Sequence, residues 1–131
     1  MIKLKQIRIE RAEGPCDLCI ERTFDTLDQA QRWINNQRET YPKLGYDKHD
    51  VTITWDNGNK FSIRLDCQHP ENKYYDGNNI ILNVIQSVNS YINHKDEYEL
   101  KPDDIIFLMA IKNNSYELPT NFNLKFKSKG E

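Results

Sequence analysis

Apolar and polar residues alternate most regularly over residues 51–65, and this alternation predicts a β-hairpin. The turn falls in the Asp-Asn-Gly stretch at residues 56–58. A two-residue loop would put the apolar sides of the two strands on opposite faces of the sheet, which the pleat makes costly. A three-residue loop, with Gly58 in the left-handed conformation, instead places Ile53 opposite Phe61. We therefore expect the three-residue loop.

The same period recurs at the N-terminus, where residues 2–9 predict a strand. Its apolar side chains change phase halfway, and a strand accommodates such a change with one extra residue. We expect this bulge at Lys5 and Gln6. Residues 11–19, which include a Gly-Pro pair, are typical of a loop, and residues 20–24 predict a second short strand.

A helical period replaces the alternation after Thr26, which together with Gln29 has the spacing of a capping box. We expect a helix that runs to about Thr40, with Trp33 as its main core anchor. Its apolar positions are Leu27, Ala30, Trp33, Ile34 and Tyr41. The positions expected to face water are Gln31, Arg32, Asn35 and Arg38.

Two more apolar stretches follow a polar segment that is rich in turn residues. Residues 80–92 carry one apolar stripe at helical spacing and predict a long helix. Pro102 and the two carboxylates after it are typical of a helix start. Residues 105–111 are apolar at nearly every position, so they predict a deeply buried helix or, as the weaker alternative, a central strand.

Together these elements predict an α+β fold, in which a small antiparallel sheet packs against two or three helices. The sheet would consist of the N-terminal strand and the central hairpin 51–65. A chain of 131 residues has the length of one domain, so we expect residues 1–131 to share one core. Residues 119–131 form a C-terminal tail, for which an edge strand and a loose basic end are both open.

Net charge narrows the range of partners. Eighteen lysines and arginines against twenty acidic residues leave a formal charge of −2. A general nucleic-acid binder needs a net basic face, since phosphate neutralisation supplies most of its affinity. A DNA mimic needs a large acidic excess. Neither class fits the whole chain, so direct nucleic-acid binding is disfavoured and only local patches remain open.

The location expected from the sequence is the cytoplasm of a host cell. The charged N-terminus lacks the continuous apolar stretch of a signal peptide, and no window reaches the length of a membrane span. Three cysteines, an odd number, indicate reduced thiols. We therefore expect no membrane partner.

The cysteines raise the question of a metal site. Cys16 and Cys19 form a C-x-x-C pair, and Cys67 with His69 would complete a Cys₃His set for zinc. The usual gap of two to five residues between the paired ligands is missing between Cys67 and His69. Zinc is therefore the weaker hypothesis, ordinary reduced cysteines are the stronger one, and we expect no cofactor. A redox role is disfavoured because a strand-like segment, not a helix, follows the pair.

No group of residues in the sequence suggests catalysis. His49, His69 and His94 are scattered and belong to no triad or His-Glu-x-x-His pattern, so we expect surface histidines. The adjacent carboxylates of Asp103 and Asp104 are explained by helix capping, and the glycines form no phosphate-binding loop. The sequence therefore predicts a protein that binds rather than an enzyme.

Two segments are candidates for a binding surface. Tyrosine is enriched at interface hot spots, and Tyr74 and Tyr75 stand together in a predicted loop. Residues 96–104 concentrate acidic groups, which would suit a basic surface that normally receives nucleic acid. These acidic residues are Asp96, Glu97, Glu99, Asp103 and Asp104, relieved only by Lys101. A solvated loop followed by a helix cap is the plainer alternative.

The segments 24–34, 46–58 and 61–66 together resemble a small domain of the large polyvalent protein-associated group, which occurs in phage and conjugative-element proteins. The pattern combines a helix that contains Trp33, an Asp-Asn-Gly hairpin and an Ile-Arg-Leu-Asp exit, and the similarity spans about residues 20–110. The resemblance implies that the chain serves a mobile element in its dealings with host defence. It brings no catalytic residues with it.

A free-standing copy of such a module implies independent use, for example as an anti-CRISPR or anti-restriction inhibitor. We therefore expect a non-enzymatic phage or mobile-element protein that inhibits a host defence complex, either a protein or a ribonucleoprotein, through a protein interface. One alternative is an accessory module, with or without zinc, that contacts nucleic acid through its N-terminal strand and Lys125, Lys127 and Lys129. Another alternative is a homodimeric scaffold.

Overall fold

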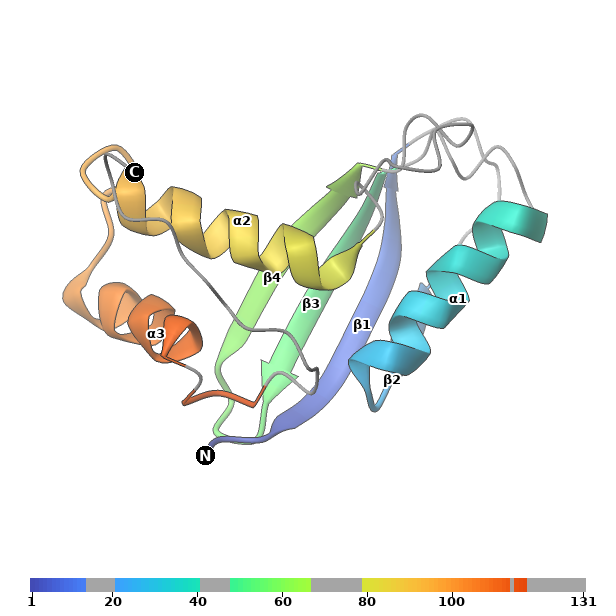
Figure 1. Cartoon of the computed structure of the whole chain (residues 1–131), viewed down its shortest axis with the longest axis horizontal. Helices are drawn as coiled ribbons and strands as arrows, with labels where there is room; N and C mark the ends of the chain where they lie inside the picture. The colour runs from blue at the N-terminus through green and yellow to red at the C-terminus, as the bar shows by residue number, and fades with distance from the viewer. Residues whose placement is uncertain (14–20, 41–47, 67–78, 114, 118–131) are drawn as a thin grey trace.

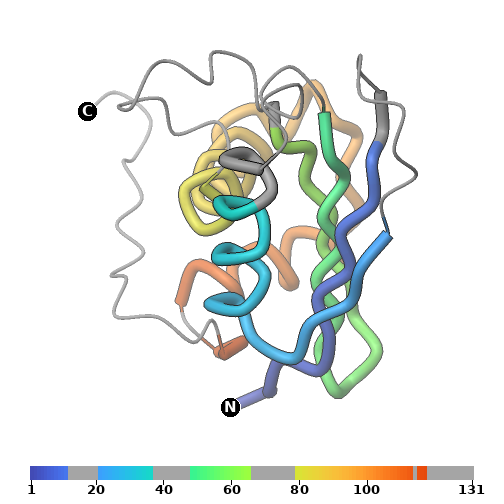
Figure 2. Tube along the Cα trace, turned by 90° about the vertical axis from the view of Figure 1, so that its right-hand side faces the viewer, coloured from blue at the N-terminus to red at the C-terminus, as the bar shows by residue number. Residues whose placement is uncertain are grey.

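The computed structural model describes residues 1–13, 21–40, 48–66, 79–113 and 115–117. Within them, four strands form one antiparallel sheet in the order β2-β1-β3-β4, and three helices lie on one face of it (Figures 1 and 2). The strands are β1 (Leu4–Glu13), β2 (Glu21–Phe24), β3 (Lys48–Trp55) and β4 (Lys60–Asp66). The helices are α1 (Leu27–Thr40), α2 (Ile80–Asn93) and α3 (Pro102–Lys112). The predicted α+β fold is therefore confirmed.

β1 contains the predicted bulge. Its pairing with β3 shifts by one residue between Leu4 and Gln6, so Lys5 is the extra residue. The strand then continues to Glu13, because β3 supplies pairing partners as far as that residue, with a second shift of register between Arg11 and Glu13. The prediction of a loop over residues 11–19 is therefore wrong for its first three residues. The second short strand is confirmed as β2.

The hairpin formed by β3 and β4 has the predicted register. Ile53 lies opposite Phe61, and the three-residue loop holds Gly58 at φ 89°. The N–H of Trp55 donates to the carbonyl of Asn59 at 2.9 Å and closes the loop. The inner faces of β1, β3 and β4 combine into one apolar surface: Ile7, Ile9, Val51, Ile53, Trp55, Phe61, Ile63 and Leu65.

His49 overturns the expectation of surface histidines. Its side chain is only 1% exposed. The cause is the start of β3 at Lys48, which brings His49 into the strand in phase with Val51 and turns the imidazole toward the helices. His94 is exposed, as predicted, and His69 lies outside the described residues.

α1 begins with the expected cap, but its core anchor differs. The hydroxyl of Thr26 accepts from the N–H of Gln29 at 3.1 Å, and the Gln29 side chain accepts from the N–H of Asp25 at 3.2 Å, one residue earlier than a capping box implies. Trp33 is only half-buried, because it lies over the short strand β2, where its ring centroid is 5.8 Å from that of Phe24. The buried side chains described in α1 are Leu27, Ala30 and Ile34.

Gln31 joins α1 to α2, so the prediction that it faces water is wrong. Its side-chain oxygen accepts from the N–H of Ile80 at 2.8 Å. The side chain of Asn79 accepts from the N–H of Leu82 at 3.0 Å. Two of the N–H groups that a helix start leaves without intrahelical partners are thereby satisfied, and the first turn of α2 is fixed against α1.

α2 and α3 occur where the sequence predicts helices, but they are buried to different extents. α2 buries its stripe: Ile80, Ile81, Val84, Ile85 and Val88. For residues 105–111 the helix is confirmed over the strand, whereas the expectation of deep burial is wrong. Only Leu108 and Ile111 of α3 are buried, and Ile106 and Met109 are exposed. A helix that rests on a sheet covers one side, and this run is apolar on every side.

The residues after α3 fasten the hairpin to the helix layer. The hydroxyl of Tyr116 lies 3.0 Å from the side-chain nitrogen of Asn57 and 2.6 Å from that of Asn59. Its ring packs edge-on against Trp55 and Phe107, with centroids 5.1 Å apart in each case. The buried rings of Trp55 and Tyr116 therefore hold Phe107 in place from its core side.

Two further sequence predictions concern the tail and the membrane. The tail at residues 119–131 lies outside the described residues, so its two alternatives stay open. None of the described helices is long and apolar enough to cross a membrane.

Candidate protein-binding site

The five predicted acidic residues lie together where the chain passes from α2 to α3 (Figure 1). Asp96, Glu97 and Glu99 belong to the connection after α2, and Asp103 and Asp104 belong to the first turn of α3. All five side chains are exposed. We call residues 96–104 the acidic corner.

The fold uses only part of the charge in the acidic corner. Asp104 accepts from the N–H of Lys101 at 3.1 Å and so caps α3. The side chains of Asp96, Glu99 and Asp103 make no hydrogen bond or ion pair with any other residue that the structure describes. Their charge is therefore available to a partner.

The acidic corner holds more negative charge than the chain as a whole. Five carboxylates and one lysine give it −4, whereas the whole chain carries −2, so the residues outside the corner carry +2. A local concentration of one sign steers oppositely charged partners toward that surface even when the net charge is small.

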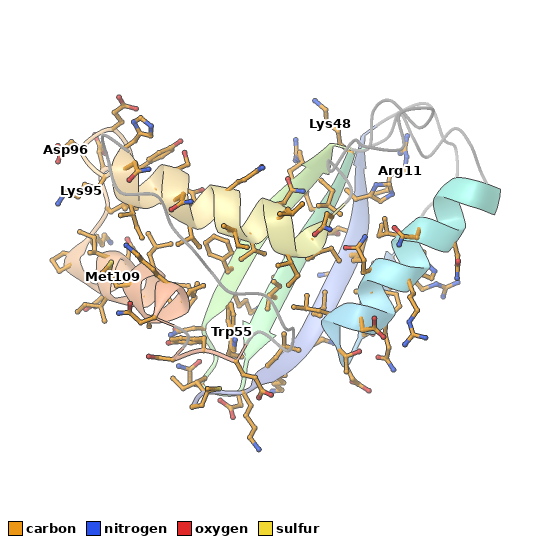
Figure 3. All side chains as sticks on the ribbon, in the orientation of Figure 1. Arg11, Lys48, Trp55, Lys95, Asp96 and Met109 are labelled. Carbon is orange, nitrogen blue, oxygen red and sulfur yellow. The ribbon has the colours of Figure 1, made fainter. Side chains whose placement is uncertain are left out.

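Exposed apolar side chains adjoin the acidic corner. Ile106 is 66% exposed and Met109 36% exposed on α3, and Tyr98 is 46% exposed in the connection. Figure 3 shows Met109 on the same side of the molecule as Asp96. Single exposed apolar residues are common, but a group of them next to a charged rim marks an interaction surface.

Two hollows lined by described residues flank α3. The larger one, which we call the edge groove, has a volume of about 350 Å³ and lies between β4, α2 and α3. Its lining includes Lys60, Phe61 and Ser62 of β4, Tyr91 of α2, and Phe107 and Leu108 of α3. The smaller one, of about 100 Å³, reaches Lys95 and Met109. Leu100 and Leu108 line both hollows, so the two form neighbouring parts of one surface.

Aromatic contacts connect the edge groove to the core and to the corner. The ring of Phe61 lies 6.4 Å from those of Tyr91 and Phe107, measured between centroids. Phe107 in turn contacts Trp55 at 5.7 Å, and Tyr91 contacts Tyr98 at 4.6 Å. Rings that are held by one another stay in place when a ligand binds, which lowers the entropy cost of binding.

Backbone strain is present in the acidic corner. Glu99 has φ 50° and is the single non-glycine residue with positive φ in the described part of the chain. The left-handed conformation costs an L-residue about 1–2 kcal/mol, and glycine normally occupies it. The Glu99 side chain makes no hydrogen bond or ion pair with other described residues that would offset this cost. Uncompensated strain clusters at functional sites, so it supports a binding role for the corner.

The other residues that the sequence singled out lie outside the described part of the chain. These are Tyr74, Tyr75, Cys16, Cys19, Cys67 and His69. The structure therefore neither brings the two tyrosines to the acidic corner nor separates them from it. Among the described residues, no three His, Cys, Asp or Glu side chains are grouped so that they could hold a metal ion. The zinc hypothesis stays a prediction.

The sequence analysis missed Ile106, Met109 and the edge groove. A signal for the first two was present, because a helix that is apolar on every side at a protein surface must expose part of that surface. No comparable signal existed for the groove, since it joins residues from β4, α2 and α3 that are far apart in the sequence.

Comparison with known proteins identifies no relative of this chain. No family model matches the chain, and neither a curated protein nor a solved structure matches it. The resemblance to the large polyvalent protein-associated group rests on the sequence pattern alone and stays a prediction.

Proposed function

We propose that this chain is a non-enzymatic phage or mobile-element protein that inhibits a host defence complex by binding it through the acidic corner and the exposed side of α3. The observation that carries the proposal is the exposure of Ile106 and Met109 beside carboxylates that the fold does not use. An apolar centre with a polar rim is the anatomy of a protein interface. If this side of α3 only contacted water, neither apolar side chain would contribute to the stability of the fold.

The chemistry of the corner supports a partner with a basic surface. CRISPR ribonucleoproteins and restriction enzymes hold nucleic acid through lysine and arginine, because phosphate contacts supply most of the affinity. A surface that carries −4 next to apolar anchors complements such a site. A protein that covers a nucleic-acid site inhibits the complex without any chemistry of its own, in agreement with the expectation of a binding protein.

The outer face of the sheet gives less support to the alternative of nucleic-acid binding. Arg8 lies 2.8 Å from Glu21, and Arg64 lies 2.8 Å from Asp50. These arginines already have carboxylate partners, so they offer little net positive charge to phosphates. The described face therefore favours a protein partner over a nucleic acid.

A plasmid-interference experiment tests the proposal. Cells that carry an active CRISPR or restriction system receive a targeted plasmid while they express the chain. We expect the wild-type chain to raise plasmid recovery about tenfold or more, and Ile106→Lys to lose this effect, because a charge on the apolar anchor removes interface energy. Gln86→Lys is the matched control, since it adds the same charge at an exposed position of α2 outside the corner and both hollows.

A second arm uses purified components. The chain, mixed with the defence complex from the protected cells, should prevent that complex from binding its nucleic acid. The charge reversal Asp103→Lys should restore nucleic-acid binding, because it places like charges against a basic surface. Absence of protection by a folded, expressed chain in both kinds of cells would contradict the inhibitor function.

A further inference from the structure

We infer that the edge groove receives an extended segment of the partner, which adds to β4 as a further strand and presents one apolar side chain flanked by basic ones. The inference rests on the proposed function, because it uses the same surface, and it specifies the form and chemistry of what binds there. The orientation of β4, the position of the groove and the surrounding charges support it separately.

The backbone of β4 is oriented for strand addition. Among the strands that the structure describes, β4 is the last one in the sheet, so one of its edges faces away from β3. Trp55 and Asn59 form a hydrogen-bonded pair, and such pairs alternate with non-hydrogen-bonded pairs along an antiparallel ladder. The backbone N–H and C=O groups of Lys60, Ser62 and Arg64 therefore point away from β3, along the edge that an added strand would use.

The edge groove runs along this same edge. It is lined by Lys60, Phe61 and Ser62, which are consecutive in β4. Successive side chains of a strand point to opposite faces, so a hollow that reaches all three residues lies beside the strand and not over one face. Its inner wall contains the rings of Tyr91 and Phe107. An apolar side chain of the added strand would enter the hollow and pack against these rings.

The charges around the groove determine the pattern of the segment. On the helix side, the groove opens beside Asp104, and the acidic corner continues with Asp103 and Glu99. On the outer side, an added strand would run past the exposed Lys60, which makes no ion pair with another described residue. Basic side chains are therefore favoured on the side of the apolar anchor and disfavoured on the opposite side. A segment that alternates Lys-apolar-Lys on one side with Thr or Ser on the other fits best.

The chain's own tail fits this pattern less well. If residues 124–129 were extended, Leu124 and Phe126 would lie on one side and the lysines on the other. Docking of Phe126 in the groove would then bring Lys125 and Lys127 to the outer side, where Lys60 of β4 would repel them. A partner segment with its lysines on the anchor side is the better occupant.

Two peptides of identical composition test the pattern by NMR titration of the full chain labelled with ¹⁵N. The probe is acetyl-Thr-Lys-Thr-Phe-Thr-Lys-Thr-amide, which has both lysines on the side of its phenylalanine. The control is acetyl-Thr-Thr-Lys-Phe-Lys-Thr-Thr-amide, which has them on the opposite side, as in the tail. We expect the probe to bind about tenfold more tightly and to shift the amide signals of Lys60 and Ser62. Equal or tighter binding of the control overturns the charge pattern and makes the tail the better occupant.

N-methylation of the probe tests strand addition itself. In an added strand, the N–H groups of alternate residues point toward β4, and those between them point to solvent. One N-methyl group at phenylalanine and one at a neighbouring threonine therefore block opposite edges. We expect one of these two peptides to lose binding about tenfold or more while the other retains it. Equal behaviour, whether both bind or neither does, overturns strand addition.

A protein variant gives an independent check. In Ser62→Pro the lost N–H points away from β3, so the ladder within the sheet keeps its bonds while the outer edge loses a donor. The control Ser62→Ala keeps the N–H and removes only the hydroxyl, which lies 3.2 Å from that of Thr52. We expect Ser62→Pro to lower probe affinity about tenfold and Ser62→Ala to leave it within about twofold, with circular dichroism showing both folded. Equal probe affinity of the two folded variants would count against the inference.

These outcomes separate the inference from the proposed function. If the methylation and proline tests fail while the wild-type chain still protects the plasmid and Ile106→Lys abolishes that protection, the inhibitor function is supported and strand addition is rejected. If the chain binds the probe with the expected edge specificity but gives no protection in cells, strand addition is supported and the inhibitor function is rejected.

Discussion

α2 and α3 are both rich in apolar residues, but only α2 buries most of them. α2 turns its stripe toward the sheet and buries Ile81, Val84, Ile85 and neighbouring residues. α3 is apolar throughout residues 105–111 and buries only Leu108 and Ile111. The apolar side chains that α3 leaves exposed, Ile106 and Met109, lie beside carboxylates that have no partner among the described residues. The difference separates a frame, made of the sheet with α1 and α2, from a corner that contributes contact surface more than stability.

The same substitution placed in each helix gives the strongest test of this difference. Ile85→Lys puts an ammonium group into the packed face of α2, where the isoleucine is only 8% exposed. Burial of an unpaired charge should lower the free energy of unfolding by about 3 kcal/mol or more. Urea unfolding followed by circular dichroism measures the loss. A change near zero in the free energy of unfolding would mean that α2 is not part of the frame.

The second test concerns the turn of the frame. Gly58 holds φ 89°, and an added Cβ would meet no atom within 4 Å, so any cost of Gly58→Ala comes from the backbone. We expect this variant to lower the free energy of unfolding by about 1–2 kcal/mol. Asp56→Ala is the control in the same loop, because Asp56 has a negative φ and its exposed side chain makes no hydrogen bond or ion pair with another described residue. An unchanged midpoint in urea for Gly58→Ala would speak against the three-residue loop.

The frame could be predicted from the sequence because its signals are local. The hairpin register follows from the alternation around Asp-Asn-Gly, and the bulge at Lys5 follows from the phase change on either side of it. The same reasoning could have placed His49 inside, since it is in phase with Val51. That prediction failed because the strand begins three residues earlier than the apolar pattern shows.

The corner was predictable only in part. Its acidic residues were found, because a charge cluster is visible in sequence. The exposed side of α3 was not, since a run that is apolar at every position has no period and so does not show which side faces the sheet. Gln31 could not be predicted from the sequence either, because its hydrogen bond to the N–H of Ile80 depends on how α1 and α2 pack against each other.

A smaller effect of opposite sign is expected in the corner. Glu99→Gly removes the strain of a left-handed glutamate but adds the backbone entropy of glycine, so it should raise the free energy of unfolding by about 0.5–1 kcal/mol. Glu99→Gln keeps the strain and removes the charge, so it should leave stability unchanged within about 0.5 kcal/mol. Both variants should weaken binding of the basic probe peptide. Loss of stability in Glu99→Gly would show that the fold itself needs the glutamate.

The smallest expected change in stability is also the most informative. Ile106→Lys places on α3 the charge that Ile85→Lys places on α2, but the isoleucine is two-thirds exposed, so the ammonium group stays in water. We expect the free energy of unfolding to change by no more than about 0.5 kcal/mol, while binding of the defence complex falls about tenfold or more. Urea unfolding and a competition assay on the same preparation measure both. If Ile106→Lys instead unfolds the chain as Ile85→Lys does, then α3 belongs to the frame, and its apolar side is structural surface with no partner to explain.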